Sequence, residues 1–461
     1  MASDEIAGVS GVFDRVVVGS ARDTIAALAT PAGRGGIGVV RVSGPGVERV
    51  AHVILSRVPR PRVATYSVFC DAHGDAIDEG IALYFEAPNS YTGESVLELQ
   101  GHGGPVLMRS LLSACLDAGA RLAEPGEFTR RAYLAGRLDL AQAEAVADLI
   151  DAESREAARS ALRSLRGEFS SAIEELAARV IELRALVEAM LDFPEEEVDG
   201  VHRDDASSRL NGIRAALSSV RATSRQGSLL RSGVQVVIVG RPNVGKSSLL
   251  NRLAGEDRAI VAATPGTTRD ALRETIDIDG VPVNLVDTAG LRESHDEVEQ
   301  LGIQRSWKEL AKADVFLWVA DATAGMDSEG EETLDRLPEA TRRISVLNKA
   351  DLLPVWPSPR REGEIYVSAL TGVGLGELRV EILRAAGWVS GTQTVFSARE
   401  RHLRAIARAQ LHLDAAHGRL GEWEFFAEEL RLAQVALGEI TGEFTPDDLL
   451  GEIFGRFCIG K

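Results

Sequence analysis

Four short polar motifs in the middle of the chain have the residue types needed to bind a nucleotide. The first is Gly240-Arg241-Pro242-Asn243-Val244-Gly245-Lys246-Ser247, which lies between a strand-like apolar run at 234–239 and a helix-like run at 248–251. Its glycines let backbone N–H groups turn toward phosphate oxygens, Lys246 adds a positive charge, and the Ser247 hydroxyl is placed to bind Mg²⁺. This motif predicts a phosphate-binding loop.

The other motifs follow apolar runs farther along the chain. Asp287-Thr288-Ala289-Gly290 follows the run 283–286, so its carboxylate would hold Mg²⁺ through water and a glycine N–H would reach the γ-phosphate. Asn348-Lys349-Ala350-Asp351 follows the run 344–347, and the Asp351 carboxylate can accept two hydrogen bonds that guanine supplies and adenine does not. Ser368-Ala369-Leu370 would back the base. Together the motifs predict a GTP site formed by Asn243, Val244, Gly245, Lys246, Ser247, Ser248, Asp287, Thr288, Ala289, Gly290, Asn348, Lys349, Asp351, Ser368, Ala369 and Leu370.

The residue after the Asp-Thr-Ala-Gly motif is Leu291, where Ras-like enzymes place a Gln that orients the attacking water. Leucine cannot hydrogen-bond, so other groups must handle the water and the transition-state charge. Asn243 could offer its amide oxygen to a monovalent cation, and the acidic run Glu293, Asp296, Glu297 and Glu299 could supply a carboxylate for the water. The residues alone leave a second interpretation open, in which Asn243 only shapes the loop and the acids form a solvated surface.

Composition sets the class of protein. A chain of 461 residues with 45% hydrophobic content has room for about three domains. Its longest apolar runs are shorter than the roughly 18 residues of a membrane helix, and its three cysteines favour a reducing, cytoplasmic compartment. The net charge of −18 argues against a protein that coats nucleic acid, although a local basic patch could still bind RNA phosphates.

The pattern along the chain predicts several domains. After an extension at 1–19, short apolar runs at 38–42, 81–85 and 96–99 alternate with turns and with one helix-like run at 106–118, which indicates an α+β domain over 20–135. Helical patterns are expected over 136–231 and 389–461. Between them, 232–388 is expected to form a Ras-like P-loop GTPase domain with a doubly wound α/β sheet, inserted into the helical domain.

Within the helical parts, one long helix is expected from Asp139 to Leu191, ended by Asp192-Phe193-Pro194, and another over 204–226. Apolar residues recur at helical spacing of three and four in Ile173, Leu176, Val180, Leu183, Val187 and Met190, and again in Leu403, Ile406, Leu413, Phe426, Leu430, Ala433 and Leu437.

Further motifs connect the whole chain to a known family. They are Thr30-Pro31-Ala32-Gly33-Arg34-Gly35-Gly36-Ile37-Gly38, Ser90-Tyr91-Thr92-Gly93-Glu94, Pro125-Gly126-Glu127-Phe128-Thr129, Leu138-Asp139-Leu140-Ala141-Gln142-Ala143-Glu144, Gly266-Thr267-Thr268-Arg269-Asp270 and Phe457-Cys458-Ile459-Gly460-Lys461. Over about residues 23–461 the chain resembles the tRNA uridine-modification GTPases called MnmE or TrmE, and its GTPase segment resembles the Era-like branch of translation-factor GTPases.

The resemblance implies a function. The family acts with a FAD-dependent partner of the MnmG or GidA type, in a heterotetramer, to build an aminomethyl or carboxymethylaminomethyl group on C5 of the wobble uridine of tRNA. The one-carbon unit comes from 5-formyl- or 5,10-methylene-tetrahydrofolate, and GTP hydrolysis is required. The family forms a homodimer through its N-terminal domain, where the folate pocket is completed.

The resemblance also assigns roles in the GTPase segment. Asn243 would bind K⁺ together with backbone of the loop at Ala262, Thr264 and Thr267, while Ser247 and Thr268 would hold Mg²⁺. Thr267 and Thr268 thereby join the GTP-binding set, and Glu299 matches the catalytic acid that activates water. The loop departs from the common family pattern at Ala262, Thr264 and Pro265, which leaves its stiffness open.

Two charged residues of the N-terminal domain stand inside apolar runs. Arg41 lies in Val39-Val40-Arg41-Val42 and Glu98 in Val96-Leu97-Glu98-Leu99, and charges in such surroundings need partners. They could pair with each other. The resemblance places both at the folate pocket, with Arg137 and Lys461 also reaching it.

Cys458 has two interpretations. Its apolar neighbours Phe454, Phe457 and Ile459 are typical of a buried structural thiol. The resemblance instead makes Cys458 a catalytic thiol that projects toward the folate site.

A different class of function, a GTP-gated RNA-binding or ribosome-assembly factor of the Era type, would need no substrate chemistry. It would need a basic RNA-binding appendage, which this acidic chain lacks, and it would have no use for the N-terminal glycine-rich motif or for Cys458.

Overall fold

The computed structural model describes residues 23–192, 200–256, 273–287, 313–325, 342–356, 363–389, 395–443, 447–455, 457–458 and 460. The chain divides into two compact units, one made of residues 1–139 with 446–461 and the other of residues 140–445. The expected extension at 1–19 lies outside the described residues. The expected C-terminal helical part, 389–461, is shared between the units, because its last segment belongs to the first unit.

The first unit combines a mixed sheet with helices. Its elements are β1 (Ile25–Leu28), β2 (Gly38–Ser43), α1 (Val47–Leu55), β3 (Thr65–Cys70), β4 (Ala76–Phe85), β5 (Val96–Gly101), α2 (Pro105–Asp117), β6 (Arg121–Leu122), α3 (Glu127–Leu134) and α14 (Asp447–Gly455). The strand order is β3-β4-β5-β2-β1-β6, antiparallel except for the parallel pair β1 and β6. The expected strands at 38–42, 81–85 and 96–99 and the helix at 106–118 are confirmed.

The core of the first unit lies on one face of this sheet. Strand residues alternate between faces, so Val40 and Val42 of β2 and Leu97 and Leu99 of β5 point to one side, where α1 and α2 pack. The opposite positions of the same strands carry the charged residues Arg41 and Glu98, which face each other across the β2–β5 ladder.

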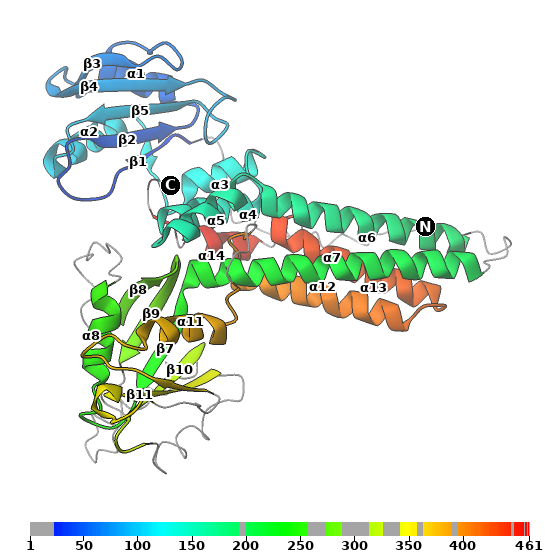
Figure 1. Ribbon diagram of the computed structural model, residues 1–461. Helices are drawn as coiled ribbons and strands as arrows, with labels where there is room; N and C mark the ends of the chain where they lie inside the picture. The colour runs from blue at the N-terminus through cyan, green and yellow to red at the C-terminus, as the bar shows by residue number, and fades with distance from the viewer. Residues whose placement is uncertain are drawn as a thin grey trace, which may run out of the picture. The chain divides into compact units, whose positions relative to one another are not determined.

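The second unit begins with a helical domain formed by α4 (Leu140–Ile150), α5 (Arg155–Leu165), α6 (Glu168–Asp192), α7 (Gly200–Ser232), α12 (Glu400–Gly418) and α13 (Trp423–Thr441). The four long helices α6, α7, α12 and α13 lie side by side as a bundle (Figure 1). Their shared core contains the expected Ile173, Leu176, Val180, Leu183 and Val187, together with Ile406, Leu413, Phe426, Leu430, Ala433 and Leu437.

The expectation of a single helix from Asp139 to Leu191 is wrong, because three helices occupy this stretch. Residues 151–154 interrupt it, and Ser154 caps α5 by accepting a hydrogen bond from the Ala157 N–H. Gly167 interrupts it again with a φ of +87°, a left-handed conformation that favours glycine. The apolar positions at helical spacing, from Ile173 to Met190, all lie within α6, so they could not report breaks that precede it. The end of α6 at Asp192 agrees with the expected stop.

The GTPase domain is inserted between α7 and α12. Its elements are β7 (Val234–Val239), α8 (Lys246–Glu256), β8 (Arg273–Ile278), β9 (Val281–Asp287), β10 (Val315–Asp321), β11 (Arg342–Asn348), the 3₁₀ helix η1 (Ala350–Leu352), β12 (Glu364–Tyr366) and α11 (Leu375–Ala385). The sheet order is β12-β11-β10-β7-β9-β8, parallel except at the β8–β9 hairpin. Alternate residues of its central strands enter two separate clusters, so both faces are buried, as in a doubly wound fold.

Candidate functional site

The phosphate-binding loop connects β7 to α8, at the carboxyl end of the central parallel strands. It turns through positive φ angles at Gly240 (+154°), Asn243 (+63°) and Gly245 (+92°). A Cβ at Gly240 would lie 2.1 Å from the Val319 carbonyl oxygen of β10, and one at Gly245 would lie 2.4 Å from Nδ2 of Asn348. Both glycines are therefore required by the close approach of neighbouring backbone and side chain.

Charge is concentrated at this loop. The Lys246 ammonium donates hydrogen bonds to the carbonyl oxygens of Gly240 (2.6 Å) and Arg241 (2.8 Å), so it lies over the loop. Ser247 and Ser248 are exposed in the first turn of α8, whose N-terminal N–H groups and dipole favour an anion. This donor set fits a nucleotide triphosphate, and the Ser247 hydroxyl is a suitable Mg²⁺ ligand.

The base-recognition motifs meet the loop through one buried side chain. Asn348, which is 2% exposed at the end of β11, donates from Nδ2 to the Val244 carbonyl (2.8 Å) and accepts at Oδ1 from the Ala369 N–H (3.0 Å). It therefore ties the phosphate loop to the motif that would back the base. Ser368 is fully buried and caps its own turn by accepting from the Thr371 N–H, whereas Leu370 is 81% exposed.

Sequence reasoning missed Asp321, at the end of β10. Its carboxylate accepts a hydrogen bond from Lys349 Nζ (2.8 Å), and this bond together with one from Thr323 lowers the pKa of Asp321 to about 2. Lys349, which belongs to the base motif, has a φ of +62°. Its bond to Asp321 holds its side chain in place. The available signal was an acid at the end of an apolar strand on the same sheet edge as Asp287 and Asn348. Asp351 is exposed in η1, where its carboxylate is accessible.

Several expected site residues cannot be placed. Asp287 ends β9, but its side chain is not described. Outside the described residues lie the K⁺-loop and Mg²⁺ positions Ala262, Thr264, Thr267 and Thr268, the motif residues Thr288, Ala289 and Gly290, Leu291, the expected water-activating Glu299 and the folate-site Lys461.

One carboxylate contacts both segments that connect the GTPase domain to the helical domain, the one that enters it and the one that leaves it. Asp148 of α4, 7% exposed, lies 2.8 Å from Nε of Arg231 at the end of α7 and accepts a hydrogen bond from the Ser397 hydroxyl (2.7 Å) on the return crossing. Arg399 donates to the same carboxylate at 2.7 Å. Both ends of the inserted domain are thus held at a single point on α4.

One turn earlier on α4, Glu144 anchors the start of α12. Its carboxylate, 2% exposed, accepts hydrogen bonds from Arg401 at 2.8 and 2.7 Å, and Nε2 of His402 lies 2.8 Å from it. Burial alone would raise the pKa of Glu144, but contact with His402 and Arg401 lowers it overall. Burial lowers the pKa of His402. Because Nδ1 of His402 accepts from the Arg399 N–H, the neutral ring carries its proton on Nε2, facing the carboxylate.

In the first unit, Arg41 and Glu98 pair with each other. Arg41 Nε and Nη2 lie 2.9 and 2.8 Å from Oε1 of Glu98, so the sequence-based alternative of mutual pairing is confirmed. The Arg41 guanidinium also lies 5.8 Å from the ring centroids of both Tyr91 and Phe128. Tyr91 and Phe128 belong to the Ser90–Glu94 and Pro125–Thr129 motifs, which are far apart in sequence and meet at this arginine.

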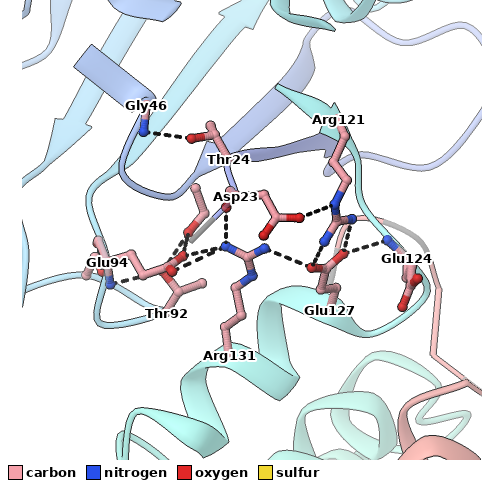
Figure 2. Close-up of polar contacts among 11 residues, drawn as sticks. Asp23, Thr24, Gly46, Thr92, Glu94, Arg121, Glu124, Glu127 and Arg131 are labelled. Carbon is pink, nitrogen blue, oxygen red and sulfur yellow. Dashed lines mark hydrogen bonds and ion pairs between the residues drawn. The ribbon is translucent and has the colours of Figure 1, made fainter. Parts of the chain in front are cut away.

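A polar network holds these two motifs in place (Figure 2). Arg131 of α3 donates to Glu127 (2.9 Å) and Glu94 (3.0 Å), and Arg121 donates to Glu127 (2.6 and 2.8 Å) and Asp23 (2.9 Å). The hydrogen bond from Arg121 lowers the pKa of Asp23. Glu127 is only 7% exposed, and although burial would raise its pKa, the two arginines lower it overall. Through Glu94 and Glu127, the network positions the loop and the helix around Arg41.

The C-terminal segment lies against the same motifs. The Gly126 N–H donates to the Cys458 carbonyl oxygen (3.4 Å), and a Cβ at Gly126 would lie 2.5 Å from the Phe454 carbonyl. Gly460 approaches the end of β1 so closely that its Cβ would lie 2.0 Å from the Leu28 carbonyl. Cys458 is exposed, so the interpretation as a buried structural thiol is wrong. The nearby Phe454 and Phe457 are buried instead, with their rings in contact. Cys115 is the buried thiol, and burial raises its pKa to about 12.

Comparison with known proteins covers both units. Residues 140–458 match the family model described as the MnmE helical domain, and residues 24–137 match the GTP-binding protein TrmE N-terminus. The chain belongs to the MnmE family of tRNA modification GTPases. The first match spans the inserted GTPase domain as well as the helices on either side of it. The prediction of a tRNA modification GTPase is thereby confirmed at the level of the family.

Curated MnmE relatives extend over nearly the whole chain. The tRNA modification GTPase MnmE of Thiobacillus denitrificans is 58% identical over 439 residues, covering 95% of this chain and 98% of the relative. That of Azoarcus sp. is 58% identical over 443 residues, with the same coverage. Among solved structures, Aquifex aeolicus Era bound to GDP and AlF₄⁻ is 28% identical, with a TM-score of 0.28. The match covers 39% of this chain and 66% of the Era chain.

Among the described helices, none is long and apolar enough to cross a membrane.

Proposed function

We propose that this MnmE-family protein is the GTP-hydrolysing component of a complex that adds an aminomethyl or carboxymethylaminomethyl group to C5 of the tRNA wobble uridine. A tetrahydrofolate derivative would supply the one-carbon unit, and a FAD-dependent partner of the MnmG or GidA type would join it in a heterotetramer. The observation that carries the proposal is that the Ser90–Glu94 and Pro125–Thr129 motifs meet at Arg41, and that the C-terminal segment is bonded to Gly126 of the second motif in the same unit. A GTPase switch alone has no need for this arrangement.

The residues present in the first unit suit a folate. The Glu98 carboxylate can accept from the adjacent N–H donors of a pterin ring, and Arg41 beside it can pair with an anionic group. Arg137 is exposed and lies beside the Gly93 loop, since a Cβ at Gly93 would lie 3.6 Å from its Cγ. Lys461 is the remaining proposed ligand. The exposed Cys458 thiol, on a segment bonded to Gly126, is the proposed catalytic thiol.

Each of these side chains has a distinct task when folate is bound. The folate derivative would supply the one-carbon group. Glu98 and Arg41 orient it, and the ion pairs of Arg131 with Glu94 and of Glu127 with Arg121 hold α3 in place. Cys458 would present its thiol at the same edge, where deprotonation controls its reactivity.

At the GTPase site, bound Mg²⁺ would neutralise developing phosphate charge and would be held by Ser247 and Thr268. Lys246 and the loop N–H groups orient the phosphates, and Asp351 selects guanine. Asn243 is exposed and has a positive φ, and its amide oxygen is the proposed ligand of a monovalent cation. Glu299 is the proposed acid that holds the attacking water.

The first unit also carries a surface suited to the proposed homodimer. On the sheet face opposite α1 and α2, the edge strand β3 exposes Tyr66 (65%) and Val68 (46%), and its neighbour β4 exposes Ile81 (40%). Neighbouring apolar side chains of this size on one face are typical of a contact with another protein surface. A second copy of the chain is the proposed occupant of this surface.

The proposed compartment is the cytoplasm, where the three free cysteines would stay reduced.

Deleting the gene tests the proposed chemistry. Mass analysis of tRNA nucleosides should show loss of the C5-modified wobble uridines in the deletion strain and their return when the wild-type gene is restored. Unchanged nucleosides would favour a GTP-gated RNA-binding or ribosome-assembly factor of the Era type instead.

The proposed cation site predicts a dependence on K⁺. GTP hydrolysis should be markedly faster in potassium chloride than in sodium chloride of equal ionic strength, because Asn243 and the following loop replace an arginine finger that would be insensitive to the salt. Asn243→Ala should remove most of the difference by slowing the K⁺ reaction. Equal rates of the wild-type protein in the two buffers would contradict the cation role and leave Asn243 as a loop-shaping residue.

A further inference from the structure

One helix of the second unit carries a row of arginines on a single side. Arg155, Arg159, Arg163 and Arg166 of α5 and its C-cap recur at spacings of four, four and three residues. At 100° per residue these positions fall within an arc of about 80°. We call this set the α5 arginine stripe. It runs for about 16 Å along the helix.

The packing of α5 fixes this side outward. Its other side is buried, with Ala157, Ser160, Ala161 and Ser164 all at most 7% exposed. The Ser160 and Ser164 hydroxyls also donate to the carbonyl oxygens of Val395 and Ser397, at 3.2 and 3.3 Å, so the helix cannot rotate without breaking buried bonds. Of the stripe, Arg155, Arg159 and Arg166 are exposed and Arg163 is half-buried.

Arg159 of the stripe is paired more loosely than several arginines of the bundle helices. On the bundle helices, Arg179, Arg209, Arg404 and Arg431 each pair with an acid one turn away at 3.1 Å or less. In the stripe, Arg159 lies 3.7 Å from Glu156, at the outer limit of an ion pair, and its side chain is 63% exposed. Four arginines on one side of a helix make that side locally positive, and such a surface attracts an anionic ligand.

We propose that the α5 arginine stripe binds the phosphate backbone of tRNA. The chain carries a net charge of −18, so most of its surface repels RNA and a local basic row is needed for binding. Arginine forks bind phosphate with two hydrogen bonds, and a linear row suits a ligand whose charges repeat along a line. The inference rests on the proposed function, in which tRNA is the substrate.

The test compares two full-length variants with the same change in net charge. The stripe variant carries Arg155→Gln, Arg159→Gln, Arg163→Gln and Arg166→Gln, and the control carries Arg179→Gln, Arg209→Gln, Arg404→Gln and Arg431→Gln. Binding of fluorescently labelled tRNA is measured by anisotropy, with GDP present, over a series of salt concentrations. The stripe variant should bind tRNA about tenfold more weakly or worse at low salt, and the slope of log K against log salt should fall by about 0.7 to 0.9 for each phosphate that the protein no longer neutralises.

The control variant should keep the wild-type slope. Equal weakening in both variants, an unchanged stripe variant, or a wild-type protein that does not bind tRNA would each overturn the proposal. GTPase rate and thermal melting report whether the stripe variant is folded. If it is not, Arg159→Gln alone should still lower the slope by the amount expected for one phosphate. These binding results are independent of wobble-nucleoside analysis, so failure of the stripe is distinguishable from failure of the proposed chemistry.

Discussion

Replacing Glu299 with alanine should lower kcat for GTP hydrolysis by about 10² to 10⁴-fold while GTP affinity stays nearly unchanged. A carboxylate that orients the attacking water acts in the transition state and contributes little to ground-state binding. Leu291 cannot take this part, because it has no group that hydrogen-bonds. Single-turnover hydrolysis and equilibrium binding of a fluorescent GTP analogue measure the two quantities separately.

A substitution with the opposite signature serves as the control. Asp351→Asn removes the paired acceptor for guanine, so it should weaken GTP binding and leave hydrolysis of bound GTP nearly intact. If hydrolysis drives the modification cycle, Glu299→Ala should also fail to restore modified tRNA in the deletion strain. Normal hydrolysis by the Glu299→Ala protein would return the role to Glu293, Asp296 or Glu297, or to a group from another molecule.

Replacing Glu144 with alanine should lower the free energy of unfolding of the helical domain by about 3 to 5 kcal/mol. The substitution leaves the Arg401 guanidinium and the fully buried His402 without the carboxylate that they share. Urea unfolding of the full chain, followed by helical circular dichroism, measures the loss. Glu175→Ala is the matched control, because it removes an exposed partner of Arg179 and should change stability little.

The same cluster predicts acid sensitivity. Burial lowers the pKa of His402 below its usual 6.5, so protonation favours the unfolded chain as pH falls below 6.5. The pKa of Glu144 lies below its usual 4.5, so its contribution is present above pH 4.5 and is lost as pH falls toward the folded-state value. Both effects have the same sign. The free energy of unfolding of the wild-type protein should therefore decline from about pH 6.5 downward. Glu144→Ala should make the decline below pH 4.5 less steep. A wild-type protein equally stable at pH 7 and pH 4 would contradict this account.

Local pattern was sufficient wherever a motif and its structure lie within one short stretch. The phosphate loop could be predicted because glycine spacing, an apolar strand before it and a helical run after it are all adjacent in sequence. The same holds for Asn348 at the end of β11 and for strands β2, β4 and β5 of the N-terminal sheet. The positions of Arg41 and Glu98 within apolar strands also indicated that they could pair, because a buried charge without a partner is costly.

Pairings between distant residues needed the tertiary structure. Asp148 meets Arg231 and Ser397 only because α4 packs beside both crossings of the inserted domain, at sequence separations of 83 and 249 residues. The apolar positions behind the expected helix over 139–191 all lie in α6, so they did not reveal the breaks that separate α4, α5 and α6. Cys458 was ambiguous for a similar reason, because the apolar residues around it in sequence point inward while its own side chain is exposed. Sequence determines which groups are available and which short segments form. Burial and long-range contact depend on how those segments pack, so packing decided which charges pair and which face outward.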